Sequence, residues 1–547
     1  MSFLPILRTP DRVIVQTDDG FLHLQPGRDG WKSGDIVVST SVDETLHVSL
    51  HAPQTAVQRI HLRWQGEIAP GALFLGDDWE RGYGTLAWRT CVPERAMPWY
   101  LLVTEGAATH GYGVKTGPAA FAFWRADETG ISLWLDVRCG GMGVLLGERT
   151  LPVAEVTARQ GQEGDTPFQA ARAFCRQLCD APRLPDHPVY GSNNWYYAYG
   201  NSSHAQILRD TELLVAHAPD DPNRPYMVID AGWQPRAVRD DVVVDSCSGG
   251  PWDHGNMRFP DMPGLAAAMR ELGARPGIWA RPLGAPPDTD PRLLMPATRS
   301  HGAKDDAPSF DPSYPENLQR IEDDMRRFTQ WGFTLIKHDF TTYDLLGNWG
   351  WAMGVAITND GWHFADRTHT TAEHILAVNR AIRRGAGETV VIACNAVSHL
   401  SAGIFEIQRT GDDTSGLYWE RTRKMGINTL AFRMPQHEAF YLADADCVGL
   451  TTEVDWAYNA QWLDLLARSA TPLFVSPNPA ALGPQQAAAL RAAFARAAHP
   501  QLIAEPLDWQ HTTCPRQWRF GEDTVTYTWV GPDGVEAAGG GYSMDVV

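Results

Sequence analysis

The chain has 547 residues, and two or three domains are expected because single hydrophobic cores stop growing at about 250–300 residues. Its formal net charge of -19 argues against nucleic-acid binding, which needs clustered lysine and arginine. No apolar run approaches the ~20 residues of a membrane span. The first residues, Met1–Pro5, lack the basic and apolar regions of a signal peptide. These features predict a folded cytoplasmic protein with no nucleic-acid or membrane partner.

Two residue types stand out in the composition. The 21 tryptophans are notable because indole offers a flat apolar face and one N–H donor, which suits sugars as well as protein cores. The eight cysteines are scattered and contain no CxxC pair. That distribution favours buried thiols in a reducing compartment over a disulfide framework.

Residues from about 10 to 160 have the pattern of β-structure. Hydrophobic side chains alternate in several short stretches, as they do in half-buried strands. Turn signals such as Asp127-Glu128-Thr129-Gly130 separate these stretches. Many short strands with turns between them are typical of a β-sandwich. We therefore predict an N-terminal β-sandwich over residues 1–165.

A polar and aromatic cluster, Gly76–Tyr83, interrupts this β-region. Such a cluster fits either a loop that contacts another domain or a loop that enters a functional site. Contact between domains is the preferred interpretation. Trp79 is the member of the cluster that we consider as a candidate to reach a pocket.

Two further segments indicate where the domains meet. A helical period over residues 166–179 is followed by Pro182 and Pro185, which predicts a domain boundary. Toward the other end of the chain, an alanine-rich helix, Gln485–Ala497, precedes alternating strands. We predict a small C-terminal β-domain over residues 483–547.

Between these boundaries, apolar strands alternate with helices. One helix opens with Pro315 in its first turn, and another opens with the capping box Thr370-x-x-Glu373. The strand candidates are Val189–Tyr199, Tyr226–Asp230, Arg275–Arg281, Thr334–Phe340, Val390–Asn395, Phe405–Arg409, Phe440–Asp444 and Pro472–Ser476. A doubly wound sheet is the rival, but nucleotide-binding glycine motifs are absent and polar residues end nearly every strand. The alternation therefore predicts a central (β/α)8 TIM barrel over residues 186–482.

The carboxyl ends of the strands define the candidate site, because they gather on one face of such a barrel. They present Trp195, Asp230 with Trp233, Trp279 with Arg281, Lys337 with Asp339, Asn395, Arg409 with Asp412 and Asp413, and Asp444. The mouth of the barrel is thus rich in carboxylates, aromatic rings and single cations. His363, His369 and His374 lack the spacing of metal ligands, and no GxSxG motif occurs. We predict no metal and no cofactor.

Lys337 and Asp339 are two residues apart, so both point to the same face of a strand. A buried charged pair costs several kcal/mol to desolvate unless it is paired or used, which leaves a structural ion pair or a functional pair. Two carboxylates in an aromatic pocket suit glycoside hydrolysis, and a retaining enzyme needs them about 5–5.5 Å apart. Lys337 is expected to hold Asp339 ionised, whereas the acid/base partner is expected to have a raised pKa.

Five motifs carry a family resemblance across nearly all of the predicted barrel. They are Ile229-Asp230-x-Gly232-Trp233, Pro276-Gly277-Ile278-Trp279, Ile336-Lys337-x-Asp339-Phe340, Arg409-Thr410-Gly411-Asp412-Asp413 and Thr471-Pro472-Leu473-Phe474-Val475-Ser476. Single motifs of this kind are weak, but five in order are fairly specific. In this order, the sequence resembles the clan D retaining α-galactosidases, and glycoside hydrolase family 36 most of all. The family also has counterparts of the two predicted β-domains.

The resemblance implies a cofactor-free double displacement in which Asp339 is the nucleophile and Asp413 is the acid/base. It also implies that Lys337, Arg409 and Asp230 hold hydroxyl groups of a small carbohydrate substrate and that tryptophans wall the pocket. The predicted pocket and substrate-binding residues that complete the set are Trp195, Trp233, Trp279, Arg281 and Asn395.

One departure from the family concerns the sugar. The family usually has two adjacent acids before Gly-Trp that hold the hydroxyls at positions 4 and 6 of galactose, but this chain has Asp230-Ala231. Losing such a carboxylate costs roughly 1–3 kcal/mol for a ligand that used it. The prediction is an α-galactosidase acting on terminal α-linked galactose of oligosaccharides. An α-glycosidase for an α-glucoside or α-linked pentopyranoside and a non-catalytic carbohydrate-binding barrel are the alternatives. The oligomeric state is not predicted.

Overall fold

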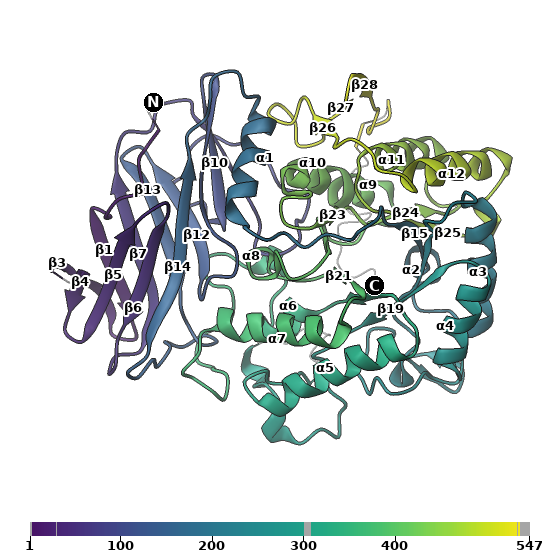
Figure 1. Cartoon of the computed structure of the whole chain (residues 1–547), viewed down its shortest axis with the longest axis horizontal. Helices are drawn as coiled ribbons and strands as arrows, with labels where there is room; N and C mark the ends of the chain where they lie inside the picture. The colour runs from purple at the N-terminus through teal and green to yellow at the C-terminus, as the bar shows by residue number, and fades with distance from the viewer. Residues whose placement is uncertain (1–2, 29, 300–307, 533, 536–547) are drawn as a thin grey trace.

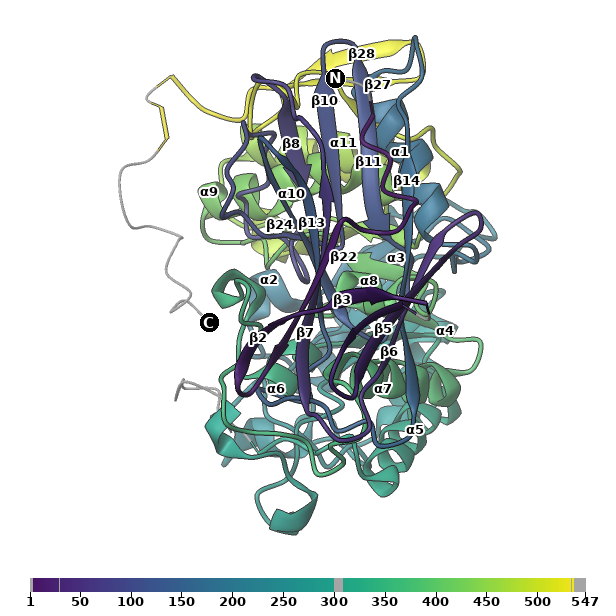
Figure 2. The same cartoon turned by 90° about the vertical axis from the view of Figure 1, so that its left-hand side faces the viewer.

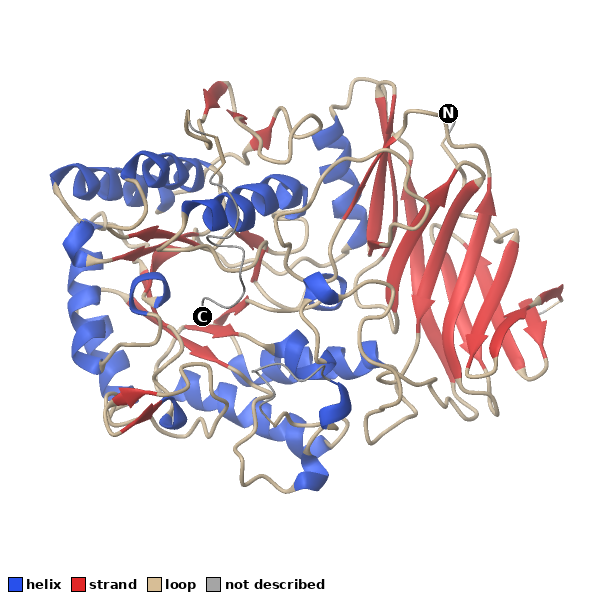
Figure 3. Ribbon diagram, turned by 180° about the vertical axis from the view of Figure 1, so that it is seen from behind, coloured by secondary structure: helices blue, strands red, loops and turns tan. Residues whose placement is uncertain are grey.

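A computed structural model of the chain describes residues 3–28, 30–299, 308–532 and 534–535 (Figure 1). Antiparallel sheets form the N-terminal part, drawn in purple and blue in Figure 1, and a parallel sheet surrounded by helices follows it. Seen from behind, the strands of the first part stand beside a ring of helices that encloses the parallel strands (Figure 3).

Two antiparallel sheets make up the N-terminal part in the described residues (Figure 2). The first has the order β2 (Gly20–His23), β1 (Arg12–Thr17), β7 (Val57–Gln65), β13 (Gly130–Asp136), β12 (Phe121–Asp127) and β9 (Met97–Pro98). The second has the order β3 (Gln25–Gly27), β4 (Gly30–Ser33), β5 (Ile36–Val42), β6 (Leu46–His51), β14 (Thr150–Arg159), β11 (Ala108–Val114), β10 (Tyr100–Glu105) and β8 (Leu73–Gly76). Both sheets contribute to one core, for example Val15 and Leu62 from the first and Val48 and Leu101 from the second. Two faces packed on one core are the arrangement of a sandwich.

Helix α1 (Pro167–Leu178) leads from the sheets to the parallel strands. Its N-cap, Thr166, accepts a hydrogen bond from the backbone N–H of Gln169, whose side chain bonds back to the N-cap backbone. This reciprocal capping satisfies two of the backbone donors that a helix start leaves free. The predicted helix over residues 166–179 is therefore confirmed to within a residue at each end.

The parallel sheet follows the eight predicted strands in chain order. Its order in the described residues is β23 (Leu442–Asp444), β22 (Ile407–Arg409), β21 (Val390–Ala393), β20 (Leu335–His338), β19 (Arg275–Ala280), β16 (Tyr226–Ile229), β15 (Tyr190–Asn193), β25 (Leu473–Pro477) and β24 (Cys447–Leu450). The first and last of these, β23 and β24, are joined only by Ala445 and Asp446. They are two halves of one interrupted strand, so the ladder is compatible with a TIM-like barrel of eight strand positions.

The first predicted strand, Val189–Tyr199, is shorter than expected. It ends at Asn193, and Trp195–Ala198 forms the short helix α2 instead. The Asn193 side-chain oxygen accepts the backbone N–H of Trp195 at 2.8 Å. This local turn competes with strand extension.

Helices cover the outside of the parallel sheet (Figure 3). The longer ones are α3 (His204–His217), α4 (Met262–Glu271), α5 (Pro315–Gln330), α7 (Thr371–Ala386), α11 (Trp456–Arg468) and α12 (Pro484–Ala497). The short ones are α6 (Thr341–Leu346), α8 (Ser398–Ser401), α9 (Trp419–Thr422) and α10 (Thr429–Arg433). The predicted first-turn proline, Pro315, and the capping box of Thr370 and Glu373 are both confirmed.

The C-terminal segment contains a small antiparallel sheet. After α12, the described residues form a three-stranded antiparallel sheet of β26 (Glu505–Pro506), β27 (Gln517–Phe520) and β28 (Asp523–Thr526). Trp518 on β27 and Trp529 after β28 are buried. Residues 536–547 lie outside the described part of the chain.

The predicted contact segment Gly76–Tyr83 does join the N-terminal sheets to the rest. Asp77 forms a buried ion pair with Arg433 at 2.8 Å and also accepts a hydrogen bond from Gln436 at 2.8 Å. Trp79 is 2% exposed and donates its indole N–H to the carbonyl of Gly354. Trp79 is therefore part of the contact between the two regions.

Two smaller observations concern membranes and thiols. In the described part of the chain, no helix has the length and apolar character needed to cross a bilayer. All eight cysteines are free. Cys175 lies on the buried face of α1 and Cys179 at its C-cap, as their four-residue spacing predicted.

The contact at Asp77 gives a prediction for stability. Asp77→Ala leaves the guanidinium of Arg433 buried without its carboxylate, which costs about 3 to 5 kcal/mol for a buried pair. We expect a lower unfolding temperature in calorimetry. Arg292→Ala is the control, because its partner Asp290 is exposed and exposed pairs contribute little. Equal unfolding temperatures for Asp77→Ala and the parent protein would contradict the prediction.

Candidate active site

A buried ion pair lies at the base of the candidate site. Lys337 on β20 contacts Asp230, which follows β16, at 2.7 Å, and their side chains are 8% and 4% exposed. Asn193 also donates to the same Asp230 oxygen, at 2.6 Å. Burial alone would lower the pKa of Lys337, but the surrounding negative groups, Asp230 first among them, together outweigh burial and raise that pKa well above its usual value. Lys337 therefore stays cationic, and its direct partner is Asp230, not Asp339 as the sequence analysis expected.

Asp339 lies directly after β20 and is partly exposed. Its two oxygens accept separate hydrogen bonds, from the backbone N–H of Phe340 at 2.7 Å and from the indole N–H of Trp279 at 3.2 Å. These donors fix the carboxylate in one orientation. The charge of Asp339 also contributes to the raised pKa of Lys337, so the two groups are electrostatic neighbours.

Phe340 adopts a left-handed backbone conformation, with φ of 60°. A non-glycine residue rarely adopts this conformation, and it persists only where neighbours hold it. Here the guanidinium of Arg281 stacks 4.2 Å from the Phe340 ring centre, and the Trp349 ring packs edge-on at 5.3 Å. The turn directs the chain from β20 into α6 immediately after the carboxylate of Asp339.

A second buried cation lies beside Asp413. Arg409, at the end of β22, contacts Asp413 at 3.2 Å and Asp446 at 2.8 Å, and it is 1% exposed. The Asp413 side chain is 26% exposed. Burial would raise the pKa of Asp413, but the charges of Arg409 and then Arg81 hold it well below its usual value. Lys337 acts in the same direction, so Asp413 and Asp339 both interact electrostatically with this lysine.

The pKa of Asp413 differs from the expectation. A group that donates a proton was expected to have a raised pKa, with its neighbour Asp412 helping to raise it. Asp412 instead forms ion pairs with Arg81 at 2.9 Å and Arg421 at 2.8 Å. These two cations largely balance the charge of Asp412, so the net electrostatic potential at Asp413 is positive.

Arg81 comes from the N-terminal part of the chain, and sequence reasoning missed it. Its guanidinium reaches Asp412 at 2.9 Å and Asp413 at 3.8 Å and stacks on the Trp349 ring at 4.9 Å. Gly82 secures the approach, since its N–H donates to Thr410 and its carbonyl accepts from Asp412. The segment Gly76–Tyr83 therefore makes the contact between the two parts of the chain, and through Arg81 it also reaches the carboxylates of Asp412 and Asp413. No local pattern identifies Arg81, because its partners lie far along the chain.

Asp446 was also missed. It lies between β23 and β24 with φ of 70°, which turns its buried carboxylate toward the segment after β22. One oxygen accepts from the backbone N–H of Thr414 at 2.8 Å, from the Tyr196 hydroxyl, and from Arg409. Asp446 thus holds both the cation beside Asp413 and the residue after it. Burial raises the pKa of nearby Asp444 to about 6.

The predicted tryptophans have different environments. Trp279 contacts Asp339 directly. Trp233 is fully buried and donates its N–H to the carbonyl of Trp279 at 2.9 Å, so it supports the strand behind the pocket. Trp195 is 5% exposed and packs edge-on against Tyr199.

Arg281 and Asn395 have their polar groups occupied by other parts of the chain. Arg281 forms a buried ion pair with Asp344 on α6 at 2.6 Å. The Asn395 oxygen accepts the backbone N–H of Thr342 at 2.9 Å, and its amide donates to Glu80. In this structure both side chains hold α6 or the N-terminal segment in place.

The arrangement suits chemistry carried out by carboxylates. Asp339 and Asp413 are partly exposed, whereas the charged groups next to them, Lys337, Asp230 and Arg409, are buried and paired. Within the described residues, no group of three or more histidine, cysteine or acidic side chains is arranged to hold a metal ion.

Comparisons with known proteins give a structural likeness only. No family model and no curated protein matches the sequence significantly. The solved structure of an α-galactosidase from Thermus thermophilus in complex with p-nitrophenyl α-D-galactopyranoside matches with a TM-score of 0.61 and 18% identity, over 94% of this chain and 99% of that chain. The GH36 α-galactosidase AgaA from Geobacillus stearothermophilus matches with a TM-score of 0.61 and 14% identity, over 94% and 79%. A cycloalternan-degrading enzyme from Trueperella pyogenes matches with 0.53 and 14%, over 96% and 88%.

These matches define the class of fold. The chain has a GH36-like fold over most of its length. The resemblance stated from the five sequence motifs is confirmed at the level of the fold. At identities of 18% and below, the likeness does not extend to substrate, because function depends on the site and not on the fold.

Proposed function

We propose that the chain is a retaining α-glycoside hydrolase, and that it is an α-galactosidase acting on terminal α-linked galactose of oligosaccharides. The observation that supports the proposal is a pair of partly exposed carboxylates, Asp339 and Asp413, which both interact electrostatically with buried Lys337, while Asp413 also forms an ion pair with buried Arg409. The fold shared with α-galactosidases supports it.

In the first step, the Asp339 carboxylate attacks the anomeric carbon of the sugar. The glycosidic carbon–oxygen bond breaks, its electron pair stays on the leaving oxygen, and Asp413 supplies the proton. A covalent β-linked glycosyl-enzyme forms. The hydrogen bonds from Trp279 and Phe340 orient the attacking carboxylate before the substrate arrives.

In the second step, water attacks the same carbon and Asp413 takes its proton. The bond between the sugar and Asp339 breaks and restores the carboxylate, so the sugar leaves with its configuration retained. Asp413 thus acts as acid and then as base. The anionic form that Arg409 and Arg81 favour suits the base. We propose that sugar hydroxyls compete for these guanidinium donors on binding and that the pKa of Asp413 then rises.

A second candidate is an α-glycosidase for another sugar, an α-glucoside or an α-linked pentopyranoside. The observation in its favour is Ala231, which is 3% exposed and presents a methyl group where the resembling family has an acid. A non-catalytic carbohydrate-binding barrel is less well supported, because both carboxylates and both buried cations are present.

The nucleophile assignment predicts a chemical rescue. Asp339→Gly is expected to lose at least 1,000-fold in kcat on an activated aryl α-galactoside, because no covalent intermediate forms. Added azide fills the vacated space and is expected to yield a β-galactosyl azide, which NMR identifies. Asp220→Gly, at an exposed position between α3 and β16, is the control and keeps parental activity. Near-normal activity of Asp339→Gly, or the absence of an azide product, would contradict the assignment of Asp339 as the nucleophile.

Sugar preference is measured with a panel of aryl α-glycosides that share one leaving group. The α-galactosidase proposal predicts a kcat/KM for the galactoside at least tenfold above those for the glucoside and the pentopyranosides. A pentopyranoside lacks the 6-hydroxymethyl group, so it tests directly whether Ala231 leaves that position unrecognised. Faster cleavage of a pentopyranoside or the glucoside would select the second candidate.

The charges around Asp413 predict opposite pH shifts for two variants. Because Asp413 acts as an acid in the protonated form, kcat falls as pH rises through the pKa of Asp413 in the enzyme–substrate complex. Arg81→Gln removes a cation 3.8 Å from Asp413, so the pKa rises and the basic limb moves up by about one pH unit. Asp446→Asn removes an anion from the same network, so the limb moves to lower pH.

The measurement is the pH dependence of kcat on saturating raffinose, whose leaving group needs protonation. Arg292→Ala is the matched surface control with an unchanged profile. Shifts of the same sign in Arg81→Gln and Asp446→Asn would show that Asp413 is not the acid.

A further inference from the structure

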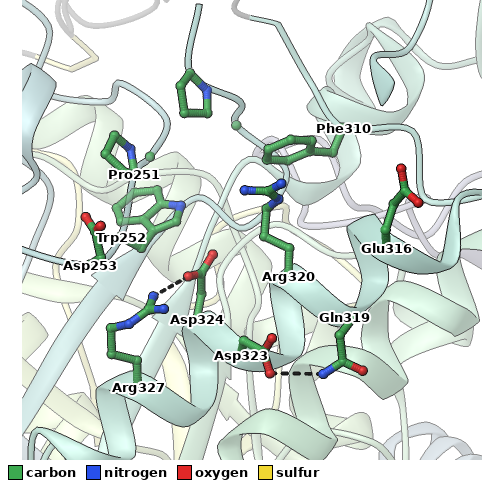
Figure 4. A pocket seen from close by; sticks show the side chains of 13 residues that line it. Pro251, Trp252, Asp253, Phe310, Glu316, Gln319, Arg320, Asp323, Asp324 and Arg327 are labelled. Carbon is green, nitrogen blue, oxygen red and sulfur yellow. Dashed lines mark hydrogen bonds and ion pairs between the residues drawn. The ribbon is translucent and has the colours of Figure 1, made fainter. Parts of the chain in front are cut away.

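A cavity of about 410 Å³ lies between α5 and the segment that precedes α4 (Figure 4). Pro251 and Trp252 line it from this segment, and Glu316, Arg320 and Asp324 line it from α5. None of its lining residues belongs to the set that surrounds Asp339 and Asp413.

The base of this cavity holds an unpaired donor. Trp252 is 3% exposed, and its indole N–H has no hydrogen-bond partner among the described residues. Figure 4 shows the ring nitrogen turned toward the cavity, on the side of Asp324 and Arg320. A buried N–H without an acceptor costs about 1–3 kcal/mol. A ligand oxygen in the cavity would remove that cost.

Asp324 supplies an acceptor next to this donor. It is 9% exposed and bonds to Arg327, which lies one helical turn further along α5. Figure 4 shows its carboxylate extending from α5 toward Trp252. Burial raises the pKa of Asp324 to about 6, against the opposing effect of Arg327. The base of the cavity therefore offers one donor and one acceptor to the same small group.

The wall adds a second donor and an apolar surface. The guanidinium of Arg320 stacks on the Phe310 ring at 5.0 Å. Arg320 is exposed and, across the described ranges, its guanidinium makes no hydrogen bond or ion pair with another side chain. Phe310 and Pro251 give the cavity apolar sides.

The charge balance narrows the ligand class. Four carboxylates and two guanidinium groups line the cavity: Asp253, Glu316, Asp323, Asp324, Arg320 and Arg327. The negative excess disfavours an anion, and the unpaired donors of Trp252 and Arg320 disfavour a simple cation. A hydroxyl group both donates and accepts. We propose that this cavity is a second binding site for a neutral polyhydroxylated ligand, namely a saccharide unit.

The cavity is connected to the candidate nucleophile through two tryptophans. The Trp252 ring packs edge-on against Trp279 at 5.9 Å, and Trp279 donates to Asp339 at 3.2 Å. A sugar bound at the Trp252 N–H would therefore contact the ring that packs against Trp279, and Trp279 is the residue that orients the Asp339 carboxylate. The site stands on its own residues, and only the choice of galactosides as probes rests on the proposed function.

The test is calorimetric titration of galactose and raffinose into Asp339→Asn protein, which binds sugar without turnover. Two classes of site are expected: the first is the site around Asp339 and Asp413, and the second is the cavity at Trp252. Trp252→Phe and Arg320→Ala, each added to Asp339→Asn, are expected to weaken the second class at least tenfold and to leave the first. Arg326→Ala is the matched control, because Arg326 lies on α5, pairs with Glu322 and Asp323, and does not line the cavity.

The possible outcomes separate this inference from the proposed function. A single class of site, unaffected by Trp252→Phe and Arg320→Ala, would overturn the second site even if the parental enzyme hydrolyses galactosides. Glycerol binding as tightly as the sugars would also overturn it, because the cavity would then not select a saccharide. Two classes of site in a protein that hydrolyses no glycoside would sustain the second site and remove the proposed function. Near-ultraviolet circular dichroism checks that Trp252→Phe is folded.

Discussion

The buried ion pair between Lys337 and Asp230 is the interaction on which the site depends. It joins β20 to β16 inside the ladder, and Asn193 connects the same carboxylate to β15. Desolvating two charges costs several kcal/mol, which is offset only by good geometry and further hydrogen bonds. The strands that carry these three side chains are therefore held in one register. Asp339, two residues beyond Lys337, takes its position from that register.

Arg409 is a second buried cation that is held by carboxylates, and its charge opposes the protonation of Asp413. Arg409 is balanced by Asp446 and Asp413, and Arg81 by Asp412. These pairs fix the segment after β22 and attach it to the N-terminal part of the chain. The same cations hold the pKa of Asp413 low, although the proposed first step needs its protonated form. Structural stability and proton donation thus make opposite demands on one carboxylate, and hydroxyl groups of the substrate are the natural means of shifting the balance.

Sequence reasoning found what depends on local periodicity and missed what depends on distant contacts. The strand ends carrying Lys337 and Arg409 could be predicted, because a period of two and short polar endings are local signals. Arg81 and Asp446 could not, because their roles arise from contacts that only the folded chain creates. Trp233 and Trp279 both lie near strand ends and both are buried, yet only Trp279 donates to Asp339, whereas Trp233 donates to the Trp279 carbonyl. Which ring faces the pocket depends on backbone geometry that the spacing does not determine.

Sugar preference in the proposed enzyme depends on Asp230, whose oxygens already accept hydrogen bonds from other groups of the protein. One Asp230 oxygen accepts from Asn193 and Lys337, and the other accepts from the backbone N–H of Ala231. A sugar hydroxyl must therefore share or replace a bond within the protein, which yields less discrimination than filling an unused acceptor. A second acid would supply such an acceptor, and Ala231 does not. Under the proposed function, discrimination between galactose and related sugars then depends on shape and on the donors of Arg409 and Arg81.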